Sequence, residues 1–213
     1  MSIAEHVWRV LGEGGTVERA AVAALLASAV SARDVAWHPT GFVVGKLRVS
    51  EHGTLRLHVW PDDARVYGEP HWPVHDHVFS LESLVLVGAV VSREHEVVDD
   101  PAGSMRRWAV DYGPGRDSRL VPEGEPVTMR PAAPITTRAG EAYSVDAGRF
   151  HASTVPEGQL AATLVATRVT GRQRPFVLGP AQPREPIDVR RMTVAPERWR
   201  QWVDRIAEAW TRS

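Results

Sequence analysis

The feature that most constrains the fold of this 213-residue chain is a long series of short strand-like segments, each ended by glycine or proline. The series begins at Phe42 and continues to Leu178, and its first two members, "FVVGKLRVS" and "TLRLHVW", flank a hairpin turn that contains Gly53. Strands at such short spacing indicate an antiparallel sandwich or barrel. The proline- and glycine-rich stretch 113–134 predicts a long, partly irregular excursion between strands. The sequence therefore predicts a mainly β fold.

Helical patterns flank this series. Residues 16–30 predict a helix with Thr16 as its N-cap, and a shorter helix is expected over residues 2–11. Residues 196–210 predict a third helix, with apolar residues at steps of three and four. Such stripes must cover an outer face of the sheet or a partner's surface, so we expect a monomer or a homodimer. We expect one structural domain, composed of an N-terminal helical segment packed on the barrel, the barrel itself and a C-terminal helix, over residues 1–38, 39–190 and 191–213.

Composition narrows the classes of partner. Lys and Arg number 25 against 26 Asp and Glu, so the net charge of −1 offers no field for nucleic acid or an anionic membrane. No apolar run is long enough to span a membrane, and the first residues lack the apolar core of a signal peptide, so we expect a cytoplasmic chain. The absence of cysteine leaves histidine and carboxylate as the only strong metal ligands. A small-molecule substrate is the partner we expect.

Three histidines stand where they can share one metal ion. His75 and His77 open the apolar stretch "PVHDHVFSLESLVLVG", and on an extended strand they point to the same face. A third ligand would come from another strand, and His151 in "GEAYSVDAGRFHAS" is the candidate, since Gly148 permits the tight turn that starts its strand. Three neutral imidazoles suit Fe(II), Zn, Mn, Ni or Cu and leave coordination positions open for substrate or water.

These two stretches resemble the two signature motifs of the cupin superfamily. The first motif runs from Gly68 through His75, Asp76 and His77 to Gly88, with one residue more than usual in its first interval. The second runs from Gly140 to His151 and carries Asp146 where proline is common. The resemblance implies a cupin double-stranded β-helix, also called a jelly-roll barrel, with His75, His77 and His151 as the metal ligands.

Many cupins add a glutamate ligand from the first motif, and Glu82 is the candidate here. Its interval from His77 is acceptable, but Leu81 occupies that slot when the count runs back from Gly88. Strict alternation turns Glu82 away from His77, and only a bulge would turn it back. The alternative is a carboxylate beside the site or an ion-paired surface residue.

The segment "HGTLRLHVWPDD" followed by "PVHDH" looks like the thiol dioxygenase branch of the cupins, which includes the cysteine dioxygenases. That resemblance implies three histidines on Fe(II), with O₂ as cosubstrate and no carboxylate ligand. The family's arginine for the substrate carboxylate would fall near Gly45, so Lys46 or Arg48 could take its place. The family's Ser-His-Tyr group would fall on Thr163, Val165 and Thr167 and is therefore missing, which does not favour cysteine as the substrate.

Other residues are candidates for contact with a substrate. His58 and Trp60 line the cavity if the aliphatic face of "TLRLHVW" packs outward on the N-terminal helices; otherwise they lie on the solvent face of an edge strand. Arg106 could supply a guanidinium or simply be exposed, and Tyr143 and Arg149 flank the third histidine in sequence. The remaining histidines are expected at the surface or in loops: His6, His38, His52, His71 and His95.

The leading functional hypothesis is a mononuclear non-heme metal-dependent enzyme, an Fe(II) dioxygenase that acts on a small polar metabolite. The second hypothesis is a non-redox isomerase or lyase in which Zn, Mn or Ni acts as a Lewis acid. The third is a cupin that binds a small molecule without turning it over.

Overall fold

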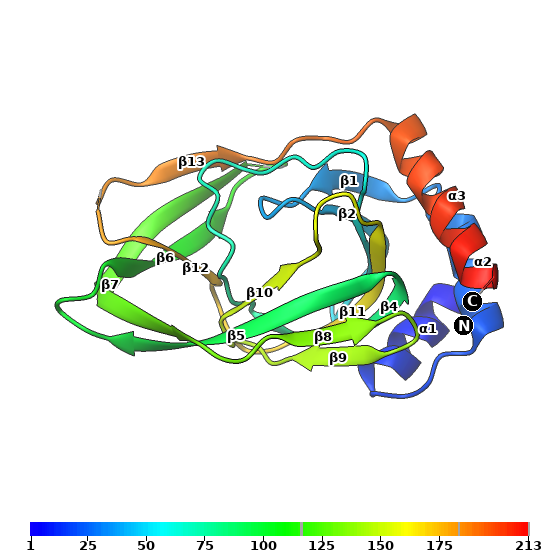
Figure 1. Ribbon diagram of the computed structural model, residues 1–213, viewed down its shortest axis with the longest axis horizontal. Helices are drawn as coiled ribbons and strands as arrows, with labels where there is room; N and C mark the ends of the chain where they lie inside the picture. Colours follow the sequence, from blue (N-terminus) through cyan, green and yellow to red (C-terminus); the bar gives the residue numbers. More distant parts are fainter. Residues whose placement is uncertain (116, 183, 213) are drawn as a thin grey trace.

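The computed structural model describes residues 1–115, 117–182 and 184–212 (Figure 1). Within these residues the chain forms three helices and thirteen strands. In chain order they are α1 (Ile3–Gly12), α2 (Arg19–Ala29), β1 (Arg33–Trp37), β2 (Val43–Ser50), β3 (Gly53–Trp60), β4 (Phe79–Val87), β5 (Ala89–Asp99), β6 (Met105–Tyr112), β7 (Asp117–Pro131), β8 (Ile135–Arg138), β9 (Ala142–Val145), β10 (His151–Thr154), β11 (Ala161–Val169), β12 (Phe176–Pro180), β13 (Ile187–Arg190) and α3 (Pro196–Arg212).

The strands make two antiparallel sheets. The six-stranded sheet has the order β1-β2-β3-β11-β4-β9, and the seven-stranded sheet contains β10-β5-β7-β6-β12, with β13 on β7 and β8 on β5. Strands far apart in sequence therefore lie side by side, as β3 and β11 do, because the chain passes repeatedly from one sheet to the other. The prediction of a mainly β fold with helices at both ends is confirmed.

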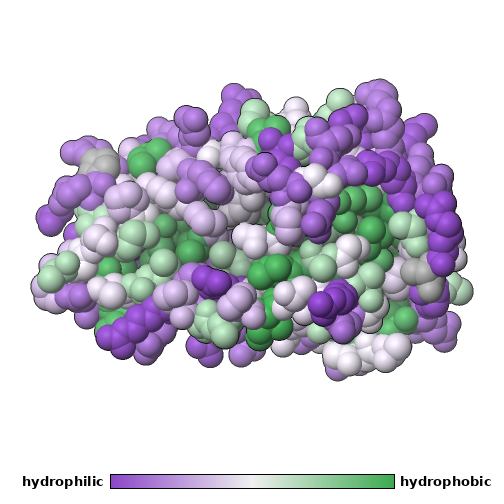
Figure 2. All heavy atoms as spheres, in the orientation of Figure 1, coloured by the Kyte–Doolittle hydropathy of each residue, from purple (hydrophilic) through white to green (hydrophobic). Residues whose placement is uncertain are grey.

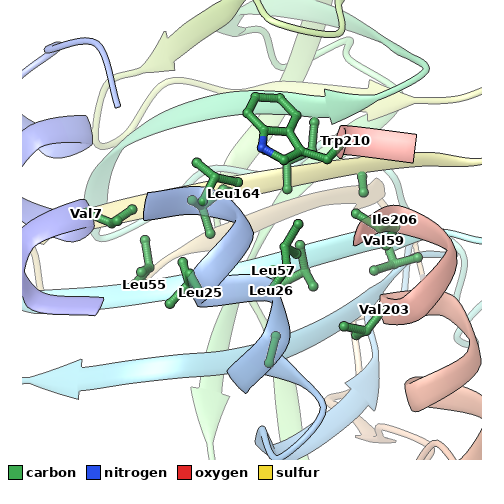
Figure 3. Close-up of a cluster of buried hydrophobic side chains, with 14 of the residues drawn as sticks. Val7, Leu25, Leu26, Leu55, Leu57, Val59, Leu164, Val203, Ile206 and Trp210 are labelled. Carbon is green, nitrogen blue, oxygen red and sulfur yellow. The ribbon is translucent and has the colours of Figure 1, made fainter. Parts of the chain in front are cut away.

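The three helices lie at one end of the molecule, against the outer face of the six-stranded sheet (Figure 1). Strand β3 alternates: Leu55, Leu57 and Val59 point outward into the helices and are fully buried. Each such side chain stabilises the fold by about 1.5–3 kcal/mol through its burial. The other members of this layer come from all three helices and from neighbouring strands of the sheet, and Figure 3 labels among them Val7, Leu25, Leu26, Leu164, Val203, Ile206 and Trp210.

Helix α3 packs on its own chain. Its indole Trp199 donates to the carbonyl of Ala29 at 2.8 Å, and Trp202 meets Trp37 edge to face with ring centroids 5.9 Å apart. Close approach requires Gly45 in β2, because a Cβ there would lie 2.5 Å from Cζ2 of Trp199. The outer edge of α3 is hydrophilic, whereas apolar residues lie between α3 and the sheet (Figure 2). The largest apolar cluster thus lies outside the six-stranded sheet, whereas the inner face carries polar as well as apolar side chains.

Two local predictions are wrong. Helix α2 begins at Arg19, and its N-cap residue Glu18 makes no side-chain capping bond, so Thr16 is not the cap. The stretch 113–134 is not an irregular excursion but holds the longest strand, β7, of 15 residues. Its glycine and prolines are accommodated by a shift in the register between β6 and β7, where Gly124 has a φ of +67°.

Candidate metal centre

The three histidines come together through backbone pairing. His75 and His151 exchange both backbone hydrogen bonds, at 3.0 and 2.9 Å, so they face each other as one antiparallel pair. Opposed residues in such a pair point to the same face. Gly148, with a φ of +78°, donates its N–H to the carbonyl of His77 at 2.9 Å, which ties the turn before β10 to the first motif. The His75–His77 segment itself lies outside a regular strand, since β4 begins only at Phe79.

The donor atoms of His75, His77 and His151 all lie within 4.8 Å of one another. Two imidazoles bound to one ion at about 2.1 Å each can be at most about 4.2 Å apart. Small side-chain rotations of the kind that accompany binding are therefore enough to bring all three onto one ion. The donor set fits a divalent transition metal.

Hydrogen bonds fix which nitrogen of two of these rings is free. Nδ1 of His75 lies 2.9 Å from the carbonyl of Pro73, and Nδ1 of His151 lies 3.2 Å from the carbonyl of Arg149. Because a carbonyl can only accept, both Nδ1 atoms carry the proton and both Nε2 atoms keep a free lone pair. This arrangement orients metal-binding imidazoles in known sites.

Burial keeps all three rings neutral. It lowers the pKa of His151 to about 3, with a further contribution from His75. Burial likewise lowers the pKa of His75, and it lowers the pKa of His77 well below the usual range. Metal binding at neutral pH therefore does not have to displace protons from these ligands.

The three histidines line a cavity of about 50 Å³ between the sheets. A cavity of that size admits a small ligand beside a metal ion. His58 and Trp60 line the cavity wall, because the aliphatic side of β3 packs outward on the helices, and Tyr143 lines it as well. Nε2 of His58 is buried without a hydrogen-bond partner, as is Oγ1 of Thr163, the residue opposite it on β11.

Glu82 does not join the three histidines. The register of β4 on β11 is continuous from Phe79 to Val85, so no bulge alters the alternation there. Phe79 and Leu81 line the cavity, and Glu82 therefore points to the opposite face. Burial, and then the nearby Asp146, raise the pKa of Glu82.

The predicted arginine and lysine contacts also lie elsewhere. Arg48 pairs with Glu5 of α1, because the register of β2 on β3 shifts between Lys46 and Arg48 and turns Arg48 to the helix side. Lys46 lies opposite Arg56 and shares its face of the sheet, but its half-exposed ammonium lies 3.9 Å from Asp34 and outside the cavity wall. Arg106 donates to the carbonyl of Gly124. Arg149 pairs with Glu94 at 3.6 Å, and its contribution to the site is the backbone carbonyl that holds His151. None of these four side chains lines the cavity.

His38 and Arg56, which were not predicted as site residues, also line the cavity. His38 was expected at the surface, but it stacks on Phe42, with ring centroids 4.3 Å apart, and its ring centroid is 5.4 Å from that of His75. Arg56 lies on the same side of β3 as His58, and this alternation was the signal that could have identified it. Burial lowers the pKa of Arg56 to about 10. His95, also expected at the surface, is buried with 9% exposure.

Asp76 supports the two ligands that flank it. Its side chain is 1% exposed and accepts from the N–H of Phe176 at 2.6 Å and from Nη2 of Arg172 at 2.9 Å. Burial raises the pKa of Asp76, and these two donors oppose that rise. Since both of its oxygens are occupied, Asp76 anchors the ligand segment to the chain around β12 rather than binding the ion.

A comparison with models of known protein families gives no match, and a comparison with curated protein sequences gives none either. None of the helices in the described residues is long and apolar enough to cross a membrane. The geometry itself defines the class of site: three buried histidines, close enough to bind one metal ion, in a mainly β protein.

Proposed function

We propose that this protein is a mononuclear non-heme metal-dependent enzyme of the cupin superfamily, and that it is an Fe(II) dioxygenase acting on a small polar metabolite. The observation that carries the proposal is the convergence of three neutral imidazoles on one cavity without a carboxylate among them. Three protein ligands leave positions open for a substrate and for O₂. The two antiparallel sheets around the cavity support the jelly-roll assignment.

The bound metal would supply the redox chemistry, and the chain's own residues supply binding, orientation and a dry site. His75, His77 and His151 would hold the ion, His75 and His151 through Nε2. Arg56 presents a guanidinium to the cavity, with its Nε donating to Thr54 at 2.7 Å and its Cζ 4.7 Å from the ring centroid of Phe79. An anionic group of the substrate is the natural partner for this cation. The cavity volume favours a small substrate.

A second candidate is a non-redox isomerase or lyase with Zn, Mn or Ni. The observation in its favour is the same donor set, because three histidines with an open position also describe catalytic zinc sites. Metal identity and oxygen dependence separate the two candidates.

The test is anaerobic purification followed by metal analysis and by measurement of oxygen consumption with a panel of small polar acids. We expect about one iron per chain and consumption that depends on one class of substrate. His77→Ala should abolish both, whereas His71→Ala, an exposed loop residue packed on Tyr67, should change neither. Stoichiometric zinc with turnover that needs no oxygen would favour the second candidate, and full iron content in His77→Ala would contradict both.

A further inference from the structure

Two arginines face the inner side of the six-stranded sheet without an acidic partner. One is Arg56 on the cavity wall. The other is Arg191, which follows β13. Ala36 and Thr193 form an antiparallel bridge, and the N–H of Trp37 donates to the carbonyl of Met192 at 2.9 Å.

The same register places Arg191 opposite His38. Opposed residues of an antiparallel pair share a face, and His38 lines the cavity, so Arg191 faces the cavity side of the sheet as well. Its Nε is buried without a hydrogen-bond partner, and its Cζ lies 5.9 Å from the ring centroid of Tyr112. Because Tyr112 is 65% exposed, this contact lies near the molecular surface, whereas Arg56 lies on the cavity wall.

Many other arginines of the chain have carboxylate partners. Arg48 pairs with Glu5, Arg172 with Asp76 and Arg205 with Asp62. Among the described residues neither Arg56 nor Arg191 forms an ion pair. Arg56 donates one hydrogen bond to them, from its Nε to the hydroxyl of Thr54. The terminal nitrogens of Arg56 remain available to a ligand in the cavity.

The charges around the cavity do not balance. The three ligand imidazoles are neutral. The carboxylate of Asp76 is paired with Arg172, and that of Glu82 points away from the cavity. A divalent ion and the Arg56 guanidinium would bring three positive charges to a cavity whose described walls offer no carboxylate, and Arg191 adds a fourth charge beside it. Buried charges without a partner are strongly unfavourable, so the missing negative charge is expected from the ligand.

We propose that Arg56 and Arg191 form a two-arginine anion site and that the substrate is a small dianion, either a dicarboxylate or a phosphate monoester. This inference rests on the proposed function and specifies its substrate class. In support, the charge of Arg191 lowers the pKa of Arg56, after the larger effect of burial. Two planar guanidiniums suit oxyanions with paired oxygens, and a single negative charge would leave one of them unmatched.

The test measures binding of malonate, inorganic phosphate and acetate to the metal-loaded protein by calorimetry. One of the two dianions should bind at least about tenfold more tightly than acetate, and the better of the two identifies the dicarboxylate or the phosphate source. Arg191→Met should weaken that binding about 10- to 100-fold, as expected for loss of a charge-assisted contact. Arg190→Met is the matched control, since Arg190 is exposed and pairs with Asp117 at 3.6 Å.

Arg191 is the preferred position for the substitution because it lies at the sheet edge, where a change leaves the core intact. Arg56→Met should weaken dianion binding by the same factor. Dianion binding unchanged in Arg191→Met, or acetate bound as tightly as both dianions, would overturn the proposal. The same titrations with His77→Ala separate it from the proposed function. That variant should lose its metal and still prefer the dianion, whereas a full metal content in it would count against the metal site alone.

Discussion

The pH dependence of folding stability tests whether His58 is buried as a neutral imidazole. Burial, followed by the charges of Arg56 and His75, lowers the pKa of His58 from 6.5 to about 3. A base with a lower pKa in the folded state binds fewer protons there than in the unfolded chain. Folding stability is therefore unaffected well above pH 6.5 and falls as the pH decreases from about 6.5 towards about 3.

The magnitude follows from these two values. Each histidine of this kind removes about 1.4 kcal/mol of stability per pH unit once the pH is below 6.5, which amounts to about 2 kcal/mol between pH 7 and pH 5. His151, with the same low pKa, adds a similar loss. Two such groups together remove a large share of the 5–15 kcal/mol that stabilises a typical domain, so the metal-free protein should become acid-labile near pH 5.

The perturbation is His58→Gln, which removes the titrating group and keeps a polar side chain of moderate size. Urea unfolding of the metal-free wild type and variant at pH 7 and pH 5 gives the free energy of unfolding of each. The variant should lose about 2 kcal/mol less than the wild type over this range, whatever its stability at pH 7. The same loss in both proteins, to within about 0.5 kcal/mol, would refute a buried neutral His58.

Four further outcomes are expected. His75→Ala should lose nearly all bound metal by elemental analysis, whereas Glu82→Gln should retain it, because Glu82 points away. Asp76→Asn should weaken metal binding about 10- to 100-fold in a chelator competition, since the charged pair with Arg172 is lost. Gly45→Ala should cost about 1–3 kcal/mol in urea unfolding, because its Cβ meets α3. Deletion of residues 196–213 should cost solubility more than metal binding, because it uncovers the apolar outer face.

Each of these expectations has an opposite result that would count against it. Loss of metal in Glu82→Gln as complete as in His75→Ala would mean that β4 turns Glu82 towards the ion. Unchanged affinity in Asp76→Asn would remove its anchoring role, for which Glu96→Gln, on an exposed part of β5, is a control. An unchanged free energy of unfolding for Gly45→Ala would mean that α3 can move, and a soluble truncated chain would mean that the outer face tolerates water.

Local patterns in the sequence were enough for several features. The alternation in β3 predicted which residues share a face, and the apolar repeat in 196–210 predicted a helix that packs through its tryptophans. His75, His77 and His151 could be chosen as a ligand set because their spacing and the glycine before His151 are local properties. Local patterns could not show that the stretch around His75 meets the stretch around His151. That contact depends on the backbone pairing of His75 with His151.

What only the tertiary structure decided is the set of residues that meet across strands. His38 lines the cavity, and Arg191 comes to lie opposite His38 because the chain near residue 37 pairs with the chain near residue 192, a contact that no sequence spacing predicts. The same holds for Arg56, whose face was predictable but whose lack of an acidic partner was not. Sequence determines the side of a strand on which a side chain lies, because that side repeats every two residues. Register between distant strands determines which side chains become neighbours, and it is set by packing of the whole core.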